Sequence, residues 1–311
     1  MEFFPFFLKI LPLYAIIVMG FFVGRKTKLH AADLAFINLH LLAPLIVFDA
    51  ITHLPMAVEN FIMPLTCFIL LGSMAGIVFA LVKRLSDDTK KPYWLAACCS
   101  TTNSGYFGIP VFLMTFGTEH LGLYMLYSLG ATIFFYVVTN YLFLRSHYTL
   151  KEAFAKIIRL PIMYAMLAGF VCQAFQWQLP TVFETFFINV RGAFIVMGMM
   201  VIGIVLGGQS EEKKGFVFEW PLILFSNVMR FAVFPSLALG LIMLDRYFIG
   251  LFSPMAQNII LMVSVLPMGA DTTSLAAQWK MHPERIAALT LVNSVIALFV
   301  IPYLLPLLLR L

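Results

Sequence analysis

The amino-acid sequence predicts an all-α polytopic membrane protein with ten transmembrane helices, arranged as two inverted repeats of five helices. Three observations predict this class. The 311 residues are 62% hydrophobic and only 11% charged, whereas a soluble domain has about 25% charged residues. Apolar runs long enough to cross a bilayer, about 17–25 residues each, recur along the whole chain. Basic residues gather in alternate connections between these runs.

Hydropathy, read together with turn residues and charges, predicts ten spanning segments. The first segment lacks the basic start and the cleavage pattern of a signal peptide, so we expect it to remain as a helix. Most connections are short, and no stretch is left for a separate soluble domain. The ten segments are 5–24, 33–53, 61–82, 93–114, 121–144, 160–178, 187–207, 218–244, 256–277 and 285–309.

The basic residues support this count independently of hydropathy. Of the 20 Lys and Arg residues, 15 follow odd-numbered segments. Basic residues in short connections stay in the cytoplasm, so both termini are expected outside it. This distribution accounts for the net charge of +5, and no nucleic-acid partner is expected. The 15 residues are Arg25, Lys26, Lys28, Lys83, Arg84, Lys90, Lys91, Arg145, Lys151, Lys156, Arg159, Lys213, Lys214, Lys280 and Arg285.

Two short matches indicate an internal duplication. Pro12 and Gly20 in the first segment are matched by Pro161 and Gly169 in the sixth, both 149 positions later (161 − 12 and 169 − 20). Because each unit has an odd number of spans, the second unit would insert upside down. Inverted repeats with interrupted helices are typical of secondary transporters, which bind substrate between the repeats. The predicted repeats are residues 1–149 and 150–311.

The fourth segment is interrupted by polar residues, glycine and proline. Gly and Pro weaken the backbone ladder of a helix, and Asn103 lies about 15 Å into the segment at a rise of 1.5 Å per residue. Unpaired backbone at that depth is tolerated where it is buried in protein or lines a wet cavity. A packing kink is the alternative. We therefore predict a break that binds substrate through Asn103, Ser104, Gly105, Gly108 and Pro110.

The ninth segment carries a similar interruption, so the two broken helices are expected to cross near the membrane midplane. The exposed N-termini of half-helices suit a carboxylate, and loose carbonyl groups suit a cation. An intramembrane carboxylate indicates function by default, although Asp271 is alternatively the partner of a buried arginine. The predicted substrate-binding residues here are Pro267 and Gly269, and the predicted ion-coupling residues are Asp271, Thr272, Thr273 and Ser274.

Two other charged residues fall inside predicted spans. Arg230 is too deep in the eighth segment to reach the membrane surface, and it is predicted either to pair with Asp271 or to bind an anionic substrate. Asp49, in the second segment, is a candidate ion-coupling residue and proton relay, with a position at the membrane interface as the alternative. The four cysteines lie in apolar runs and are interpreted as buried thiols. No cofactor is expected beyond H⁺ or Na⁺ as a coupling ion.

At these residues the sequence resembles the auxin efflux carrier family, which includes plant PIN-type exporters and bacterial malate and malonate carriers. The run from Asn103 to Pro110 has the family's Asn-x-x-x-x-Gly-Ile-Pro spacing. Residues 265–269, followed by His282-Pro283, are similar to the same region of the plant proteins. The resemblance covers nearly the whole chain. Further matches are Pro12-Leu13-Tyr14, Pro44, and Arg230-Phe231 with Pro235.

The resemblance implies a fold like that of the bile acid symporters. Segments 1, 2, 6 and 7 would form a scaffold that makes a homodimer, and segments 3–5 and 8–10 a core that moves like an elevator. Asn103 would contact the substrate carboxylate. Plant relatives carry a second proline soon after Pro267, where this chain has Asp271-Thr272-Thr273, which favours ion coupling or a more polar substrate than auxin. The short connection 145–159 is similar to bacterial members, so a bacterial inner membrane is expected.

The predicted function is secondary active transport of a small mono- or dicarboxylate, coupled to H⁺, Na⁺ or the membrane potential. No phosphate-binding Gly-x-x-x-x-Gly-Lys-[Ser/Thr] loop occurs, so ATP hydrolysis by this chain is not expected. A transporter of this kind is not expected to be an enzyme. One alternative is a membrane sensor without transport. The other is an intramembrane aspartyl protease using Asp49 and Asp271, although Gly269-Ala270 precedes Asp271 in place of a Gly-x-Gly. Substrate, direction and coupling ion stay open.

Overall fold

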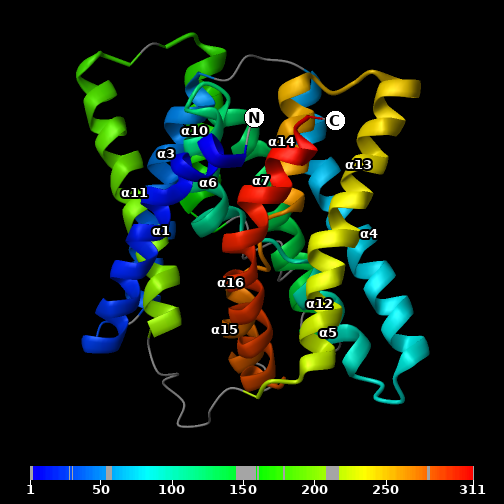
Figure 1. The fold of residues 1–311 in the computed structure, drawn as a ribbon. Helices are drawn as coiled ribbons and strands as arrows, with labels where there is room; N and C mark the ends of the chain where they lie inside the picture. The colour runs from blue at the N-terminus through cyan, green and yellow to red at the C-terminus, as the bar shows by residue number, and fades with distance from the viewer. Residues whose placement is uncertain are drawn as a thin grey trace.

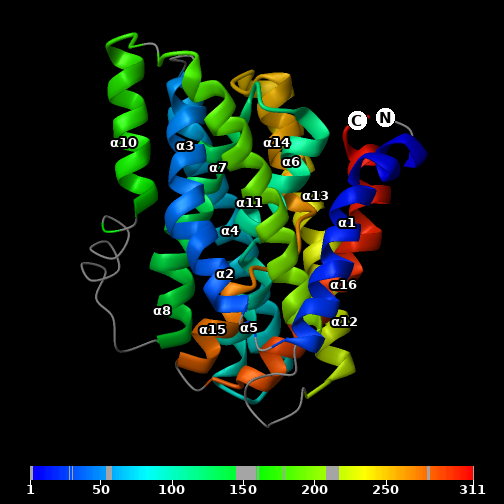
Figure 2. The same ribbon diagram turned by 90° about the vertical axis from the view of Figure 1, so that its left-hand side faces the viewer.

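Helices form all the regular secondary structure in the described part of the chain. The computed structural model describes residues 3–53 without 28 and 30, 58–144, 159, 161–177, 179–207, 217–278 and 281–310, and contains no strand within them. The helices lie side by side, and both chain ends lie at the same end of the bundle (Figures 1 and 2). This is the all-α class that the composition predicts.

Within the described residues, five continuous stretches are long and apolar enough to cross a membrane, which indicates a membrane protein. Three of them belong to single helices: α4 (Val58–Leu85), α11 (Val182–Gly207) and α16 (Pro283–Leu308). The fourth stretch, which lies in the fifth predicted segment, joins α7 (Leu121–Phe134), η3 (Phe135–Thr139) and α8 (Asn140–Leu144). The fifth stretch, which lies in the eighth predicted segment, joins α12 (Trp220–Val228), η4 (Met229–Val233), α13 (Phe234–Leu244) and η5 (Asp245–Ile249).

The other predicted segments are also helical, but most are shorter or interrupted. The first contains α1 (Phe3–Lys26), and the sixth contains α10 (Pro161–Ala174). The second contains α2 (Ala31–Ile37), η1 (Asn38–Leu42) and α3 (Ala43–Thr52). The fourth is divided into α5 (Lys91–Ser100) and a second half made of η2 (Ser104–Gly108) and α6 (Ile109–Phe116). The ninth is divided into α14 (Pro254–Ser264) and α15 (Asp271–Gln278).

The eighth segment is longer than predicted. Its helix begins at Trp220 and runs to Ile249 instead of ending at residue 244. The charged pair Asp245-Arg246 suggests an end there, but the Asp245 carboxylate is buried and accepts hydrogen bonds from the backbone N–H groups of Leu251 (2.8 Å) and Phe252 (3.1 Å). Gly250 then ends the helix in the left-handed conformation.

Close glycine contacts join α1 to α11 and α10 to α3. A Cβ atom at Gly20 would lie 2.6 Å from the carbonyl oxygen of Met200, and one at Gly169 would lie 2.9 Å from Cβ of Ile51. Only glycine permits backbones to approach this closely, as is typical of helix pairs in membranes. The helices of the first, second, sixth and seventh segments therefore contact one another (Figure 2).

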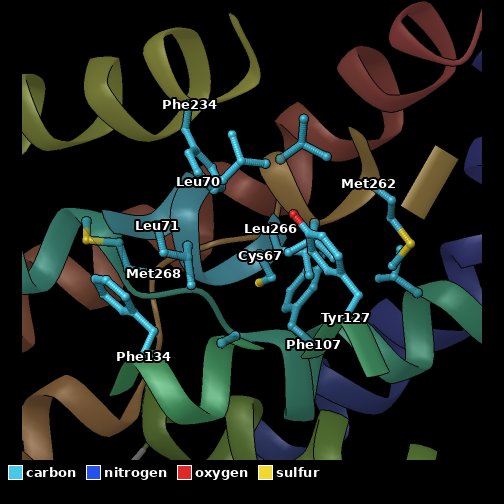
Figure 3. Close-up of a cluster of buried hydrophobic side chains, with 14 of the residues drawn as sticks. Cys67, Leu70, Leu71, Phe107, Tyr127, Phe134, Phe234, Met262, Leu266 and Met268 are labelled. Atoms are coloured by element: carbon cyan, nitrogen blue, oxygen red, sulfur yellow. The ribbon is translucent and has the colours of Figure 1, made fainter. Parts of the chain in front are cut away.

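A second group of helices packs around α4, which contacts α5 and α7. Figure 3 shows buried side chains from α4, η2, α7, α13 and α14 meeting the unwound stretch of the ninth segment. Three of the four cysteines, Cys67, Cys98 and Cys99, are fully buried thiols in this core, as predicted, whereas Cys172 is only half-buried. The labelled residues are Cys67, Leu70, Leu71, Phe107, Tyr127, Phe134, Phe234, Met262, Leu266 and Met268.

The bundle has one end rich in basic residues. The helices α1 and α4 end, and α5 and α16 begin, at the end opposite the chain termini (Figure 1). The last turn of α1 carries Arg25 and Lys26, and that of α4 carries Lys83 and Arg84. The basic residues and the termini therefore lie at opposite ends, as the alternation of charges predicts.

Candidate functional site

The first unwound stretch, residues 101–103, separates α5 from η2. Asn103 caps the second half-helix, because its Oδ1 accepts a hydrogen bond from the backbone N–H of Phe107 (3.2 Å) and its carbonyl oxygen accepts one from Gly108 (2.9 Å). An asparagine before a helix is a favourable cap because it satisfies an otherwise unpaired backbone N–H. This stretch is thus stabilised mainly by its own neighbours in the sequence.

The break lies ahead of the residues that were expected to cause it. Gly105, Gly108 and Pro110 all lie in helical backbone, with Pro110 in the first turn of α6, where a missing N–H is tolerated. Gly108 has a packing role instead: a Cβ atom there would lie 2.1 Å from the Tyr124 hydroxyl and 2.8 Å from Cδ1 of Leu266. That hydroxyl donates to the carbonyl oxygen of Ser104 at 2.6 Å.

The second unwound stretch, residues 265–270, is stabilised by remote residues. Arg230 of η4 donates from Nε to the carbonyl oxygen of Leu266 (2.6 Å). Asn293 of α16 accepts at Oδ1 from the backbone N–H of Met268 (2.7 Å). These partners lie in the eighth and tenth segments, so nothing close in the sequence identifies them.

The two unwound stretches touch, and we call their contact the crossover. The backbone N–H of Asn103 donates to the carbonyl oxygen of Pro267 at 2.9 Å. A Cβ atom at Gly269 would lie 3.4 Å from Cβ of Thr101 and 3.5 Å from the carbonyl oxygen of Thr102. Residues more than 160 positions apart, 103 and 267 among them, therefore form one structural unit.

A cavity of about 530 Å³ adjoins the crossover. Of the predicted site residues, Asn103, Ser104, Gly105, Gly269 and Asp271 line it. Its other polar lining residues are His40, Thr101, Thr102, Tyr106, Ser128, Thr132, Tyr136 and Asn140. Its apolar lining residues are Phe36, Ala43, Val47, Ile109, Met125, Leu129, Ala131, Phe135, Pro161, Ile162, Met166 and Leu275.

Four polar residues of the fifth segment line the cavity and were not predicted as site residues. Ser128, Thr132, Tyr136 and Asn140 are spaced four apart, so they follow one face of a helix. Thr132 donates to the carbonyl oxygen of Ser128 (3.1 Å), and Asn140 to that of Phe135 (3.1 Å). A polar stripe at this spacing in an apolar helix is a signal that the sequence does contain.

Of the predicted ion-coupling residues of the ninth segment whose side chains the structure describes, Asp271 lines the cavity and Thr272 and Thr273 do not. Asp271 begins α15 with an exposed side chain, and no ion pair or hydrogen bond holds its carboxylate within the described residues. Thr272 is buried and donates to the carbonyl oxygen of Gly269 (2.7 Å). Thr273 is half-buried, and Ser274 lies in α15 with a side chain outside the described part of the structure.

Arg230 and Asp49 both lie away from this cavity. Arg230 is fully buried and bonds to backbone carbonyl groups, so it forms neither the predicted pair with Asp271 nor part of the cavity wall. Asp49 forms an ion pair with Arg191 of α11 and lines a different cavity with His53. Sequence reasoning missed Arg191, because nothing local distinguishes it as the partner of Asp49. Pro267 contributes through its carbonyl group at the crossover, and neither Pro267 nor Pro110 lines the cavity.

Comparison with known proteins gives one informative relative. No family model matches the chain. The sequence is 20% identical over 303 residues, covering 94% of this chain and 95% of the relative, to a protein of Methanothermobacter thermautotrophicus named "Uncharacterized transporter". The similarity therefore spans almost the whole length of both chains.

Proposed function

We propose that this protein is a secondary active transporter of a small organic anion in the cell membrane. The observation that carries the proposal is the cavity at the crossover, where two interrupted helices meet. Interrupted helices that meet around a cavity are the typical substrate site of secondary transporters. The full-length similarity to a protein named as a transporter supports the same conclusion.

The backbone around the cavity suits a carboxylate. The N-terminal residues of η2, Ser104, Gly105 and Tyr106, line it, and so does Asp271 at the start of α15. The N-terminus of a helix carries partial positive charge and unpaired N–H groups, which favour anions. Thr102 also lines the cavity, and its buried hydroxyl has no hydrogen-bond partner in the described part of the chain.

The lining favours one carboxylate and an apolar body over a dicarboxylate. Among the residues that the structure describes, the lining contains no Lys or Arg, and His40 is its only basic residue. A second carboxylate would lose its hydration without a cationic partner, which is costly. Side chains such as Phe36, Met125 and Phe135 instead offer apolar contact to the rest of a substrate.

Asp271 provides the means of coupling. Its charged carboxylate would repel a substrate anion in the same cavity, so binding of the anion is favoured when a proton neutralises it. This coupling is reciprocal: the anion strengthens binding of the ion as much as the ion strengthens binding of the anion. The other titratable groups of the lining are His40, Tyr106 and Tyr136.

Two glycine contacts support an architecture of ten spans in two inverted repeats. Gly20 meets Met200, and Gly169 meets Ile51. Gly20 and Gly169 are 149 positions apart, and so are Ile51 and Met200 (169 − 20 and 200 − 51). A pseudo-two-fold axis relates residue i to residue i + 149, so it converts the first contact into the second. This pattern is expected for duplicated units that pack against each other.

In this architecture the cavity opens toward the cytoplasm. It is lined by the start of the second and sixth segments and by the end of the fifth and ninth, which adjoin the basic connections. The cavity would open to the outside if the helices around α4 moved as an elevator against those around α11. Both termini would lie outside the cytoplasm. The latter group would form the interface of a homodimer.

The enzyme alternative fits the site poorly. An aspartyl protease needs two carboxylates that share a proton, but Asp49 and Asp271 line different cavities and Asp49 pairs with Arg191. A sensor without transport remains the second candidate, because a ligand cavity alone serves either role.

The test combines binding with transport. The purified protein is heated with malate, malonate, succinate, lactate or indole-3-acetate, and the acids that raise its unfolding temperature are then offered, radiolabelled, to proteoliposomes. We expect stabilisation by monocarboxylates and uptake that protein-free liposomes lack. Stabilisation without uptake in either direction would indicate a sensor, and no stabilisation of folded protein by any acid would contradict the anion assignment.

A further inference from the structure

Three buried polar side chains from the eighth and tenth segments hold the second unwound stretch, and we call Asn227, Arg230 and Asn293 the polar clamp. Besides its bond to Met268, Asn293 donates from Nδ2 to Oδ1 of Asn227 (2.9 Å). Asn227 in turn donates from Nδ2 to the carbonyl oxygen of Ile223 (2.8 Å). The clamp therefore connects residues 266–268 to α12 and α16.

Arg230 is a cation without a carboxylate partner among the described residues. Its side chain is fully buried, and its Nε and Nη2 atoms donate to the carbonyl oxygens of Leu266 and Val263, at 2.6 Å and 3.3 Å. Its guanidinium lies over the ring of Phe234, 4.6 Å from the centroid. The C-terminal end of α14 carries partial negative charge, so the carbonyl groups and the aromatic face together replace a counter-ion.

The carbonyl groups of the second stretch are largely satisfied by protein donors. Leu266 accepts from Arg230 and Pro267 accepts from Asn103. Gly269 accepts from the N–H and the hydroxyl of Thr272, and Ala270 from the N–H of Thr273. Carbonyl groups without protein donors at the end of a broken helix can bind a coupling cation. Here the positive charge beside these carbonyl groups is the guanidinium of Arg230.

We propose that Arg230 is a positioning residue that does at the crossover what a bound metal cation does at other broken helices, so that substrate binding needs no Na⁺. By fixing Leu266 it holds the adjacent carbonyl of Pro267 against the N–H of Asn103, which caps the half-helix at the cavity. This inference rests on the proposed function only where it concerns substrate binding. The contacts of the polar clamp are tested without any ligand.

The first test compares the fully buried Arg230 with the partly buried Arg191 by hydrogen exchange. Arg230→Met removes the clamp cation, and Arg191→Met, the matched control, removes an arginine that pairs with Asp49 away from the crossover. Arg230→Met should raise exchange about ten- to a hundredfold in peptides covering 101–104 and 265–270, as expected when charge-assisted hydrogen bonds are lost. Arg191→Met should leave these peptides unchanged. Equal exchange at the crossover in both variants would overturn the proposal.

A second test uses the unmodified protein, so it does not depend on whether a variant folds. The unfolding temperature is measured in NaCl and in choline chloride at equal ionic strength, without substrate and with any acid that binds. We expect the same value in both salts. Stabilisation specific to Na⁺ would overturn the proposal.

In the hydrogen-exchange test, Arg230→Lys keeps the charge and loses the fork of donors. It should restore part of the protection that Arg230→Met loses.

The outcomes separate this inference from the proposed function. Protection at the crossover that depends on Arg230, with no Na⁺ effect and no transport of any acid, would leave the positioning role intact and count against the transporter. Transport that strictly requires Na⁺ would confirm the transporter and overturn the role of Arg230.

Discussion

The two broken helices meet at one site, yet they satisfy their backbone groups in opposite ways. In the fourth segment, Asn103 caps the half-helix that follows it in the sequence. In the ninth segment, Arg230 and Asn293 reach residues 266 and 268 from other helices. The comparison teaches that the first break is encoded locally and faces the cavity, whereas the second depends on tertiary contacts and joins the cavity to the core.

The largest effect is expected at Asp271, the only carboxylate that lines the cavity within the described part of the chain. Asp271→Asn should retain substrate binding and abolish accumulation against a gradient, because the coupling ion loses its site. Accumulation in proteoliposomes with an imposed pH or Na⁺ gradient is the measurement. Asp49→Asn is the matched control: it alters an intramembrane carboxylate in another cavity and should still accumulate substrate, per folded molecule. Unchanged accumulation by Asp271→Asn would disprove its role in coupling.

Gly108→Ala should come next, because it disturbs the place where both breaks meet. The added Cβ would lie 2.1 Å from the Tyr124 hydroxyl, and overpacking costs about 1–3 kcal/mol. Gly108→Ala should therefore lower the unfolding temperature, and adding Tyr124→Phe should restore part of it. Gly76→Ala, where nothing lies within 4 Å, should cause no loss. A similar change at both glycines would contradict the tight packing at Gly108.

Asn293→Ala tests the remotely supported break. It leaves the N–H of Met268 without its acceptor and Oδ1 of Asn227 without its donor, which should cost about 1–3 kcal/mol in the free energy of unfolding. The control is Asn140→Ala, because among the described residues the Asn140 amide bonds only to Phe135 in its own helix. Unfolding in detergent should show the larger loss for Asn293→Ala, and the reverse order would mean that the second break is not held by the tenth segment.

Asn103→Ala tests the locally capped break and should have the smallest effect on stability. Losing the cap costs about 1 kcal/mol, while affinity for the substrate should fall about tenfold with the loss of one contact. Asn103→Asp separates the two roles, because an aspartate caps the helix equally well but repels a carboxylate. Binding titrations should show weak binding by a stable Asn103→Asp protein. Affinity equal to the unmodified protein would remove Asn103 from the substrate site.

The features that depend on local composition could be predicted from the sequence alone. Apolar runs, the alternation of basic residues and the capping residue Asn103 are all expressed within a few neighbouring positions, because membrane insertion and helix capping act over that range. The helical class and the interruptions of the fourth and ninth segments were predicted in this way. The cause of the first break was not, since Gly108 and Pro110 lie in helix.

Only the tertiary structure decided which distant groups meet. Arg230 bonds to carbonyl groups instead of Asp271, Asp49 pairs with Arg191, and a helix stripe from Ser128 to Asn140 forms a cavity wall. A buried polar group in a membrane must find a partner, so the sequence requires that partners exist for Arg230 and Asp49. It does not name them, because a hydrogen bond depends on the distance between two atoms, and packing of the whole bundle sets that distance.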